Sequence, residues 1–406
     1  MNKKKESKVV PNVRFKGFTD DWKQRKFEDM AVRSSEISSE TILPRVEYED
    51  IISGTGCLNK NIFDKESCKN GIIFHKGDVL YGKLRPYLQN WLLPSFNGIA
   101  VGDFWVLKPQ NVDSSFLYIL IQSRKFDEIA NQSTGTKMPR ADWNLVSKSK
   151  FLIPCTVDEQ ATIGAYFKRL DNLITLHQQK ITLLTKLKKT MLEKMFPKKG
   201  SVIPEFRFNG FANAWEQRKL GDIVERVTRK NQNIVSDLPL TISAQYGLID
   251  QNEFFDKRVA SKDVSGYYLI YNGEFAYNKS ISNDAPWGAI KRLDRYENGV
   301  LSTLYIVFKI KNEEKTNSDF IATYYDTNIW HKDIKAIAAE GARNHGLLNI
   351  TPADFFETKL KFPKNVLEQQ KIGIYFGNID HLITLHQRKL DMLKKLKSAC
   401  LSEMFI

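Results

Sequence analysis

A decapeptide that occurs twice constrains the fold of this chain more than any other feature. Residues 171–180 read DNLITLHQQK, and residues 380–389 read DHLITLHQRK. The match extends over residues 159–196 and 368–405, where 21 of 38 positions are identical at an offset of 209 without a gap. An internal repeat is read first because it decides the architecture before any local pattern does. The chain therefore contains two versions of one 38-residue segment.

A second duplication opens each half of the chain. PNVRFKGFTDDWKQRKFEDM, residues 11–30, matches PEFRFNGFANAWEQRKLGDI, residues 204–223, at ten of twenty positions. Each half thus has an opening RF-x-GF segment, a more divergent body, and an EQ-initiated segment that ends in MF. The length of 406 residues allows two or three domains of about 150 residues each, and the repeat indicates two bodies with connecting segments.

The EQ-initiated segments have the apolar periodicity of long helices. Steps of four and three residues pass through apolar positions in both segments, which is the a/d seam of a coiled coil. Without an internal proline, each helix would extend about 57 Å at about 1.5 Å per residue, which is too long to bury its stripe on one small domain. The predicted seam consists of Ile163, Phe167, Leu170, Ile174, His177, Ile181 and Leu184 in the first segment and Ile372, Phe376, Ile379, Ile383, His386, Leu390 and Leu393 in the second.

We expect the two helices to pack against each other in antiparallel orientation. A parallel pair would require the 171-residue body between them to carry the chain back, whereas antiparallel packing follows from a twofold-like repeat. The alternative is that each helix packs separately on its own domain. His177 and His386 lie near the middle of their helices, where a polar seam residue often fixes the register. A core histidine without a functional role is the alternative, and no acid or nucleophile at defined spacing indicates catalysis.

The composition favours an anionic partner. Lys and Arg total 61 against 47 Asp and Glu, a formal net charge of +14. Nucleic acid is the commonest such partner, a membrane surface is the main rival, and a merely basic protein is the third possibility. No apolar run approaches the roughly 20 residues that span a bilayer, so we expect a cytoplasmic protein and no membrane partner. The cysteines and the six histidines show no zinc-ligand spacing, so no metal site and reduced thiols are expected.

The bodies, residues 30–157 and 224–366, alternate short β-rich runs with turn signals. This pattern predicts an α/β (α+β) fold with irregular β-rich sheets. GDVLYGK at 77–83 aligns with GEFAYNK at 273–279, although most other body residues differ. One scaffold with two different surfaces indicates two different ligands of one class.

Basic, aromatic and amide side chains recur in the turns that follow these strands. Arginine and lysine suit phosphates and guanine edges, and asparagine suits adenine. For any single residue a solvated loop is an equal alternative, but the loops recur at matching positions in both halves. The candidate DNA-binding residues are Tyr81, Lys83, Arg85, Lys137 and Arg140 in the first body and Tyr277, Lys279, Arg292, Arg343 and Asn344 in the second.

Catalytic motifs are missing from the sequence. The chain has no GxxxxGK[ST] phosphate loop, no nucleophile elbow, and no [DN]PP[YF] motif of an adenine methyltransferase. Asp354 with Glu357 and Lys359 superficially resembles a nuclease cluster, but such triplets are frequent by chance when 27% of residues are charged. We therefore expect a non-catalytic protein that reads a ligand without acting on it.

The whole plan resembles the specificity subunit of type I restriction-modification enzymes. The motifs that carry the resemblance are W-x-QRK near the start of each half, GD-x-LYGKLRPY and GEFAYNKS in the bodies, and the DEQ and LEQQ openings of the helices. The resemblance implies two target recognition domains, each reading one half of a bipartite asymmetric DNA site, separated by an antiparallel coiled coil. It also implies two methyltransferase (modification) subunits docked on the helices and restriction subunits in the full complex. S-adenosylmethionine, ATP and Mg²⁺ would belong to those partners, and this chain would hold no cofactor.

The expected organisation follows the repeat. The first recognition domain spans 1–157, the first long helix with its linker spans 158–200, the second recognition domain spans 201–366, and the second long helix spans 367–406. Two other functions stay open at this point: a DNA-binding scaffold without sequence preference, and a self-contained nuclease or methyltransferase. Turnover by the purified chain alone would favour an enzyme, and a methylated motif that does not depend on this chain would favour a scaffold.

Overall fold

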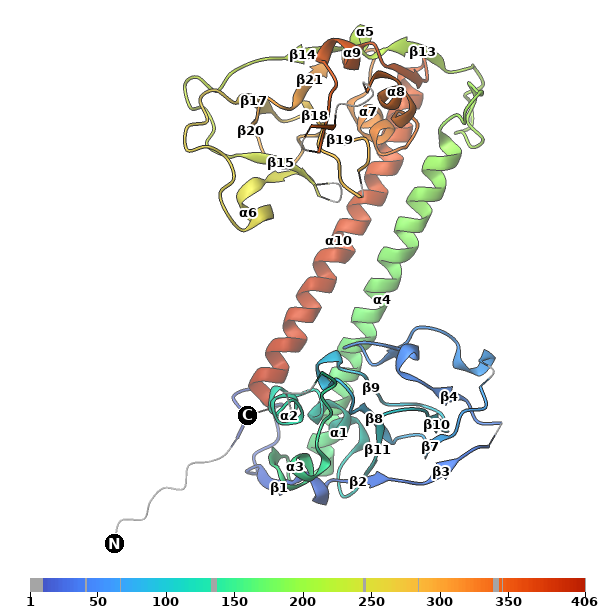
Figure 1. Cartoon of the computed structure of the whole chain (residues 1–406), viewed down its shortest axis with the longest axis vertical. Coiled ribbons are helices and arrows are strands. Elements are labelled where there is room, and N and C mark those ends of the chain that lie inside the picture. The colour runs from blue at the N-terminus through green and yellow to red at the C-terminus, as the bar shows by residue number, and fades with distance from the viewer. Residues whose placement is uncertain are drawn as a thin grey trace. The chain divides into compact units, whose positions relative to one another are not determined.

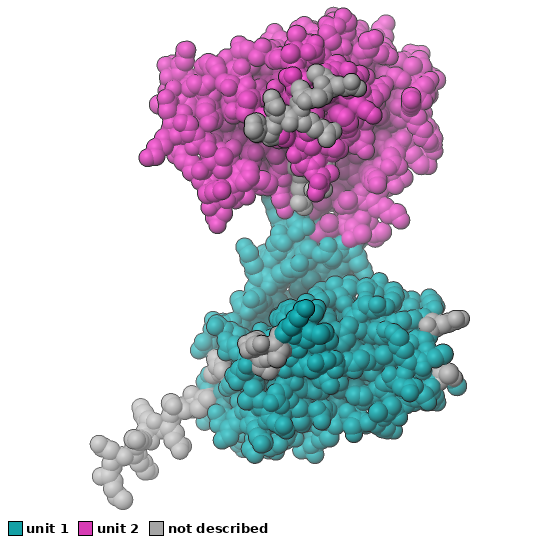
Figure 2. Space-filling model, in the orientation of Figure 1, with its two compact units in different colours: residues 1–180, 386–406 teal, residues 181–385 magenta. Residues whose placement is uncertain are grey.

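The protein comprises two compact units, each made of one body and parts of both long helices. The structure, a computed structural model, describes residues 10–40, 42–65, 67–132, 137–243, 246–283, 285–338, 343–344 and 346–405 (Figure 1). The first unit is residues 1–180 with 386–406, and the second is residues 181–385 (Figure 2). The division falls within α4 (Val157–Met195) and α10 (Val366–Met404), the two helices of the repeated segment.

The body of the first unit is built from short strands, three short α-helices and 3-10 turns. Its helices are α1 (Ser114–Leu120), α2 (Arg124–Ala130) and α3 (Trp143–Lys148). Its 3-10 turns are η1 (Phe27–Asp29), η2 (Tyr48–Asp50), η3 (Ile62–Asp64) and η4 (Pro86–Leu88). Its strands are β1 (Lys23–Lys26), β2 (Ala31–Ser34), β3 (Ile37–Ser38), β4 (Arg45–Val46), β5 (Ile51–Ile52), β6 (Cys57–Leu58), β7 (Gly71–Phe74), β8 (Val79–Gly82), β9 (Trp91–Leu92), β10 (Gly98–Ala100), β11 (Phe104–Pro109) and β12 (Lys150–Ile153).

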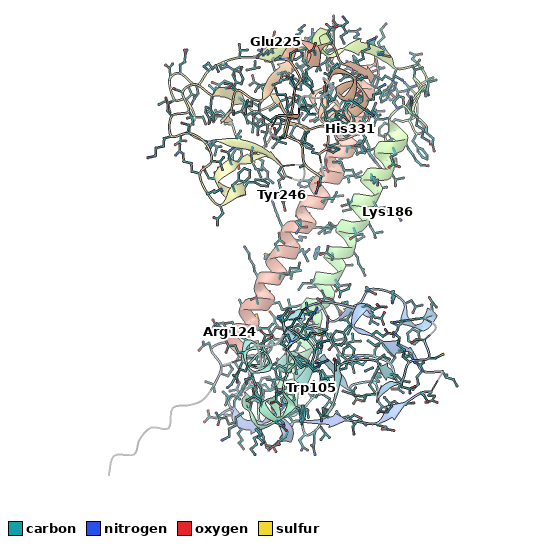
Figure 3. All side chains as sticks on the ribbon, in the orientation of Figure 1. Trp105, Arg124, Lys186, Glu225, Tyr246 and His331 are labelled. Carbon is teal, nitrogen blue, oxygen red and sulfur yellow. The ribbon has the colours of Figure 1, made fainter. Side chains whose placement is uncertain are left out.

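The main sheet of the first unit, in the order β2-β11-β8-β9, is covered on both faces. Alternate residues of a strand point to opposite faces, and here the two sets join two different cores. Tyr81 and Trp105 belong to the core that contains the helices (Trp105 is labelled in Figure 3). Leu80 and Val106 pack on the second sheet, of order β3-β7-β10-β4. Apolar residues on both faces explain why these strands read as continuous hydrophobic runs.

The body of the second unit repeats this plan. Its helices are α5 (Leu220–Ile223), α6 (Gln251–Phe255), α7 (Ser318–Tyr325), α8 (His331–Ile337) and α9 (Pro352–Phe356). Its strands are β13 (Glu216–Lys219), β14 (Val224–Val227), β15 (Leu240–Ser243), β16 (Gly247–Asp250), β17 (Tyr268–Tyr271), β18 (Phe275–Asn278), β19 (Ala289–Arg292), β20 (Asn298–Leu301), β21 (Ile306–Ile310), β22 (Arg343–Asn344), β23 (Leu347–Leu348) and β24 (Lys359–Phe362). Its main sheet, β14-β21-β18-β19, again has Phe275 and Phe308 on the helix side and Ala276 and Val307 on the opposite face.

The two long helices run antiparallel, as the sequence predicts. In the first unit, Ile163 and Phe167 near the start of α4 share a core with Met404 and with Phe405, which follows the end of α10. In the second unit, Met195 and Phe196, at the end of α4 and just beyond it, share a core with residues near the start of α10. Each helix therefore begins beside one body and ends in the core of the other. The prediction of a mixed fold with an antiparallel coiled coil is confirmed.

The repeated Glu of the EQ motif ties each helix to its opening segment. Glu159 accepts hydrogen bonds from Arg14 Nε at 2.6 Å, Arg14 Nη2 at 2.7 Å and Trp22 Nε1 at 3.1 Å. Glu368 accepts the equivalent bonds from Arg207 at 2.6 and 2.8 Å and from Trp215 at 3.3 Å. Both carboxylates are almost fully buried, and a bidentate guanidinium is a partner that can satisfy a buried carboxylate.

The Gln of the same motif ties each helix to its body. Gln160 Nε2 donates to Pro154 O at 3.0 Å, and its Oε1 accepts from the backbone N–H of Asp113 at 2.9 Å. Gln369 makes the same two bonds, each at 2.8 Å, with Pro363 O and the N–H of Asn317. Asp113 and Asn317 cap α1 and α7, so each Gln fixes the start of a body helix.

A glycine four residues after the Gln lets that body helix approach. A Cβ on Gly164 would lie 1.9 Å from Ser115 Oγ, and one on Gly373 would lie 2.5 Å from Asp319 Cβ. The repeated Glu, Gln and Gly residues of the motif thus share one structural role, because together they dock a body on its helix.

The sequence also led us to expect no membrane-spanning segment and reduced cysteines. Within the described part of the chain, no helix combines the length and the apolar composition needed to cross a bilayer. Cys57, Cys68, Cys155 and Cys400 are free.

Candidate nucleic-acid interface

In the first unit, the two loops that the sequence singles out are paired with each other. The loop after β8 and the segment that ends at Arg140 form a β-bridge between Leu84 and Arg140. The N–H of Arg85 donates to Pro139 O at 2.7 Å, and the N–H of Ala141 donates to Lys83 O at 2.8 Å. Two segments that are more than fifty residues apart in the sequence therefore lie side by side, and their cationic side chains come from neighbouring backbone positions.

Asp103 organises the cations at this loop pair. Its carboxylate lies 3.4 Å from Lys83 Nζ and 3.0 Å from Arg140 Nη2. Two cations share one carboxylate, so the three side chains keep a net positive charge. Lys137 is exposed and forms no ion pair with any residue that the structure describes. The loop pair is thus an electropositive surface, as a phosphate-binding site requires.

Arg85 has an unusual backbone that the sequence does not reveal. Its φ is +50° in the left-handed region, just before η4, and its Nε is buried without a hydrogen-bond partner among the described residues. A left-handed non-glycine residue with an unsatisfied buried donor is strained, and such strain concentrates at functional positions.

In the second unit, the equivalent loops are paired in the same way. Ser280, after β18, forms a β-bridge with Leu347 in β23. The N–H of Ile281 donates to Gly346 O at 2.8 Å, and the N–H of Leu348 donates to Lys279 O at 3.0 Å. Arg343 and Asn344 form β22, the partner strand of β23, while their side chains lie outside the description. Residues 134–136, 340–342 and 345 of the two glycine loops also lie outside the described residues.

Lys279 is a partly desolvated cation. Its Nζ donates to Ile350 O at 3.3 Å, and none of the ion pairs among the described residues includes it. Burial lowers the pKa of Lys279 below its usual value, because desolvation disfavours the charged form. An approaching anion would stabilise that charge.

Three candidates have structural roles instead. Tyr81 and Tyr277 are buried in the cores, and the hydroxyl of Tyr277 donates to Trp287 O at 2.8 Å. Neither ring is free to stack on a base. Arg292 pairs with Asp294 at 2.6 Å and with Asp319 at 2.8 Å, so two carboxylates already neutralise its charge. The sequence did not separate these residues from their exposed neighbours because strand residues next to a loop alternate between core and surface.

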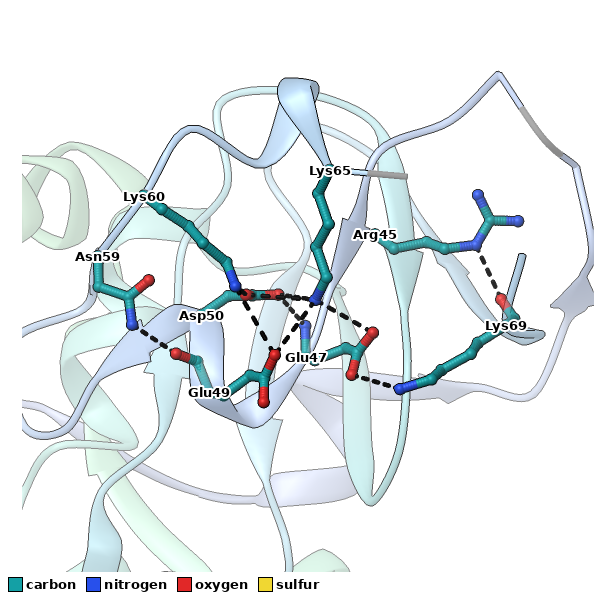
Figure 4. Close-up of polar contacts among 8 residues, drawn as sticks. All are labelled: Arg45, Glu47, Glu49, Asp50, Asn59, Lys60, Lys65 and Lys69. Carbon is teal, nitrogen blue, oxygen red and sulfur yellow. Dashed lines mark hydrogen bonds and ion pairs between the residues drawn. The ribbon is translucent and has the colours of Figure 1, made fainter. Parts of the chain in front are cut away.

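A polar network elsewhere in the first body shows how lysines can be neutralised (Figure 4). Asp50 is fully buried and pairs with Lys60 at 2.7 Å and with Lys65 at 2.9 Å. Lys69 pairs with Glu47 at 2.8 Å. The buried Arg45 donates from Nε to Lys69 O at 2.8 Å and so fixes the same loop. Each of these three lysines is held by at least one carboxylate, whereas Lys137 and Lys279 form no ion pair with any residue that the structure describes.

Comparisons with known proteins identify a family domain in the first half of the chain. Residues 19–186 match the family model described as the type I restriction modification DNA specificity domain. The matched region covers the first body and most of α4, and the second half of the chain repeats the motifs of the first. Residues 19–186 are therefore similar to the DNA-specificity domain of type I restriction-modification systems.

One solved structure shares this fold over nearly the whole chain. The S subunit of a type I restriction-modification system from M. genitalium is 14% identical, with a TM-score of 0.65 over 98% of this chain and 99% of that one. The HsdS subunit from Thermoanaerobacter tengcongensis is 18% identical, with a TM-score of 0.39 over 94% of this chain and 95% of that one. The comparison with curated proteins gave no match.

The match of the first body and most of α4 is to a DNA specificity domain, which agrees with a sequence-specific recognition subunit. The resemblance inferred from the sequence motifs is therefore confirmed. The loop pair holds Lys83, Lys137 and Arg140 in the first body and Lys279 in the second, as far as side chains are described. Which residues contact DNA stays a prediction, carried in the first body by Lys83, Arg85, Lys137 and Arg140 and in the second by Lys279, Arg343 and Asn344.

The nuclease-like triplet of the specificity subunit is dispersed. Asp354 accepts from the hydroxyl of Thr351 at 2.7 Å at the start of α9, and Glu357 pairs with Lys219 at 2.6 Å. Among the residues that the structure describes, no group of three or more His, Cys, Asp or Glu side chains is placed to hold a metal ion.

The seam histidines of the specificity subunit meet. His177 Nδ1 and His386 Nδ1 lie 2.9 Å apart, within one hydrogen bond, and the rings are 5.1 Å apart between centroids. Burial, the ring of His386 and the charge of Lys389 lower the pKa of His177. Neutral His177 is therefore the form that this packing favours.

Proposed function

We propose that each unit of this specificity subunit reads one half of a bipartite, asymmetric DNA target. The observation that carries the proposal is the loop pair, which occurs in both units with the same backbone connections and different side chains. Identical connections provide the same approach to DNA, and different side chains provide different base preferences. Lys and Arg at the loops would contact phosphates and base edges in the major groove.

Charge removal at the loop pairs tests this assignment. Lys137→Ala or Lys83→Ala should weaken binding through the first half-site, and Lys279→Ala through the second. Each phosphate contact that is lost should reduce the slope of log K against log [salt] by about one. Lys198→Ala, at an exposed lysine paired with Glu205 in the linker, removes the same charge elsewhere and serves as the control. Unchanged affinity and slope in all three loop variants, measured on the assembled complex, would contradict the assignment.

We also propose that two modification subunits dock on exposed apolar positions of the long helices. Leu183 is 61% exposed, and its repeat equivalent Met392 is 63% exposed. These positions belong to a second stripe outside the a/d seam, made of Leu173, Leu176, Leu183 and Leu187 on α4 and of Leu382, Leu385, Met392 and Leu396 on α10. Each pair is related by the repeat offset of 209. Two equal apolar surfaces fit two copies of one partner, and exposed patches of this kind mark protein interfaces.

Single substitutions can separate the two docking events. Leu183→Asp should remove one modification subunit from the complex and Met392→Asp should remove one as well, whereas the double variant should bind none. Thr384→Asp, at an exposed threonine of α10 that is not one of these apolar positions, is the control. Native mass spectrometry of the purified complex measures the stoichiometry. Two bound subunits in every variant would place the docking surface elsewhere.

Catalysis is proposed to reside in the partners. S-adenosylmethionine would bind the modification subunits, and ATP and Mg²⁺ would serve the restriction subunits. The purified chain incubated with DNA, S-adenosylmethionine and Mg²⁺ should give neither methylation nor cleavage, and turnover would favour a self-contained enzyme. A scaffold without sequence preference would leave the genomic methylation motif unchanged when this chain is deleted or replaced.

A further inference from the structure

One seam lysine of each long helix joins three elements. Lys397 of α10 lies 2.6 Å from Asp171 of α4 and donates to Gln122 Oε1 of the first body at 3.0 Å. Lys188 of α4 lies 2.7 Å from Asp380 of α10 and 2.7 Å from Asp326 of the second body. Each ammonium therefore connects its own helix to the opposite helix and to a body.

The two lysine sites are equivalent by sequence and by structure. The offset of 209 relates Lys188 to Lys397 and also Asp171 to Asp380. Gln122 and Asp326 each lie nine residues after the residue that caps the preceding body helix, Asp113 for α1 and Asn317 for α7. The body residue differs between the sites, but its position does not.

The charges at both sites are balanced. At the first site, the single cation Lys397 meets the single carboxylate of Asp171, and Gln122 is neutral. At the second site, Asp326 replaces the amide, and Lys291 of β19 adds a second cation 2.6 Å from it. Burial opposes the charge on Lys188, but Asp326 and Asp380 outweigh burial and raise its pKa. A buried ion pair without full compensation is strongly unfavourable, so such matching indicates a selected arrangement.

We propose that Lys397 and Lys188 are positioning residues that orient the recognition bodies, and that they act crosswise. Lys397, encoded in the second half of the chain, orients the first body, and Lys188, encoded in the first half, orients the second. This inference rests on the proposed function, in which each body reads one half-site. Base readout requires side chains held within about 0.5 Å of their productive geometry, so a body that rocks on its helices loses discrimination.

Substitution by methionine isolates the ammonium contacts. Lys397→Met and Lys188→Met keep the apolar stem in the seam and remove the N–H donors. Lys395→Met and Lys186→Met are the matched controls, because these lysines are repeat equivalents, are exposed, and lie two residues before the positioning lysines (Lys186 is labelled in Figure 3). Gln122→Leu and Asp326→Leu remove the acceptor on the body and leave the contact between the helices in place. Asp326→Leu also removes the ion pair with Lys291.

Genome-wide mapping of methylated adenines in cells with the full complex gives the readout. The half-sites are first assigned by exchanging residues 224–366. Lys397→Met and Gln122→Leu should raise methylation at sites mismatched in the first half-site by about tenfold relative to matched sites, which corresponds to the loss of one charge-assisted hydrogen bond. Lys188→Met and Asp326→Leu should do the same at the second half-site only.

The outcomes separate this inference from the proposed function. If Lys397→Met relaxes the second half-site, both half-sites equally, or neither while the motif persists, the positioning role is contradicted. If Lys397→Met does not fold, Gln122→Leu decides, and unchanged discrimination in that variant overturns the role. A genomic motif that does not depend on this chain at all would instead contradict the proposed function.

Discussion

At the scale of single residues, amino acids that are identical in the two repeats make equivalent contacts in the two units. Glu159 and Glu368 bind an arginine and a tryptophan with distances that agree within 0.2 Å between the units. The sequence revealed that these residues recur but not what they touch. Partners more than one hundred residues away in the chain cannot be read from one sequence, although identical polar letters in two repeats were an available signal.

The Glu159 cluster should be a large local contribution to stability. Glu159→Gln leaves the guanidinium of Arg14 without its countercharge in a mostly buried site, and loss of one partner of such a pair costs about 3 kcal/mol. We expect the free energy of unfolding in denaturant to fall by about that amount, and Glu368→Gln to have the same effect in the second unit. Glu193→Gln, at an exposed position of α4, is the control. A loss no larger than that of the control would contradict the role of the cluster.

The histidine pair should make stability depend on pH. The pKa of His177 is lowered in the folded protein, so the unfolded chain binds more protons as the pH falls through the usual range near 6.5. The free energy of unfolding should therefore decrease between about pH 7.5 and about pH 5.5. Comparison of the wild type with the double variant His177→Leu/His386→Leu measures how much of this decrease in the free energy of unfolding the two histidines cause.

The double variant should lose less stability on acidification, whereas His381→Leu, at an exposed histidine of α10, should behave as wild type. An equal loss in wild type and in the double variant would show that the pair does not titrate with folding.

At the scale of elements, regular patterns were predictable and irregular connections were not. The heptad seam is a strong and long signal, so both long helices were predictable. The observed helices, Val157–Met195 and Val366–Met404, begin two residues before the EQ motifs. The strands β8 and β18 were also indicated by the aligned segments GDVLYGK and GEFAYNK. The burial of Tyr81 and the pairing of Leu84 with Arg140 were not, because they depend on contacts distant in sequence.

The length of the two long helices should set the number of base pairs between the two half-sites. Insertion of the same four residues after Lys180 and after its equivalent Lys389 adds about one turn and about 6 Å to each helix. The apolar stripe then keeps nearly the same direction, and the recognition loops are untouched. We expect unchanged half-site bases with a spacer longer by one or two base pairs, since base pairs along B-DNA are about 3.4 Å apart.

Part of such an insertion can be absorbed by a local stutter, so reduced activity is compatible with this prediction. An active variant that methylates the original motif with its original spacer would show that the helices do not set the distance. Changed half-site bases with an unchanged spacer would show the same.

At the scale of the whole molecule, two bodies share one backbone framework, and we propose that each reads a different half-site. The repeat places equivalent helices, caps and loop pairs in both units, and the divergent side chains distinguish them. The net charge of +14 suits a polyanionic ligand, and the loop pairs present cations without full compensation. Independent reading of two half-sites is the function that we propose for this organisation.

Exchange of residues 224–366 for the corresponding body of another family member tests that claim most directly. The methylated adenine motif is mapped across the genome before and after the exchange, in cells that carry the full set of subunits. The account predicts a bipartite motif in which one half changes and the other half, together with the spacer, stays the same. A change in both halves, or a motif that does not respond to the exchange, would contradict the account.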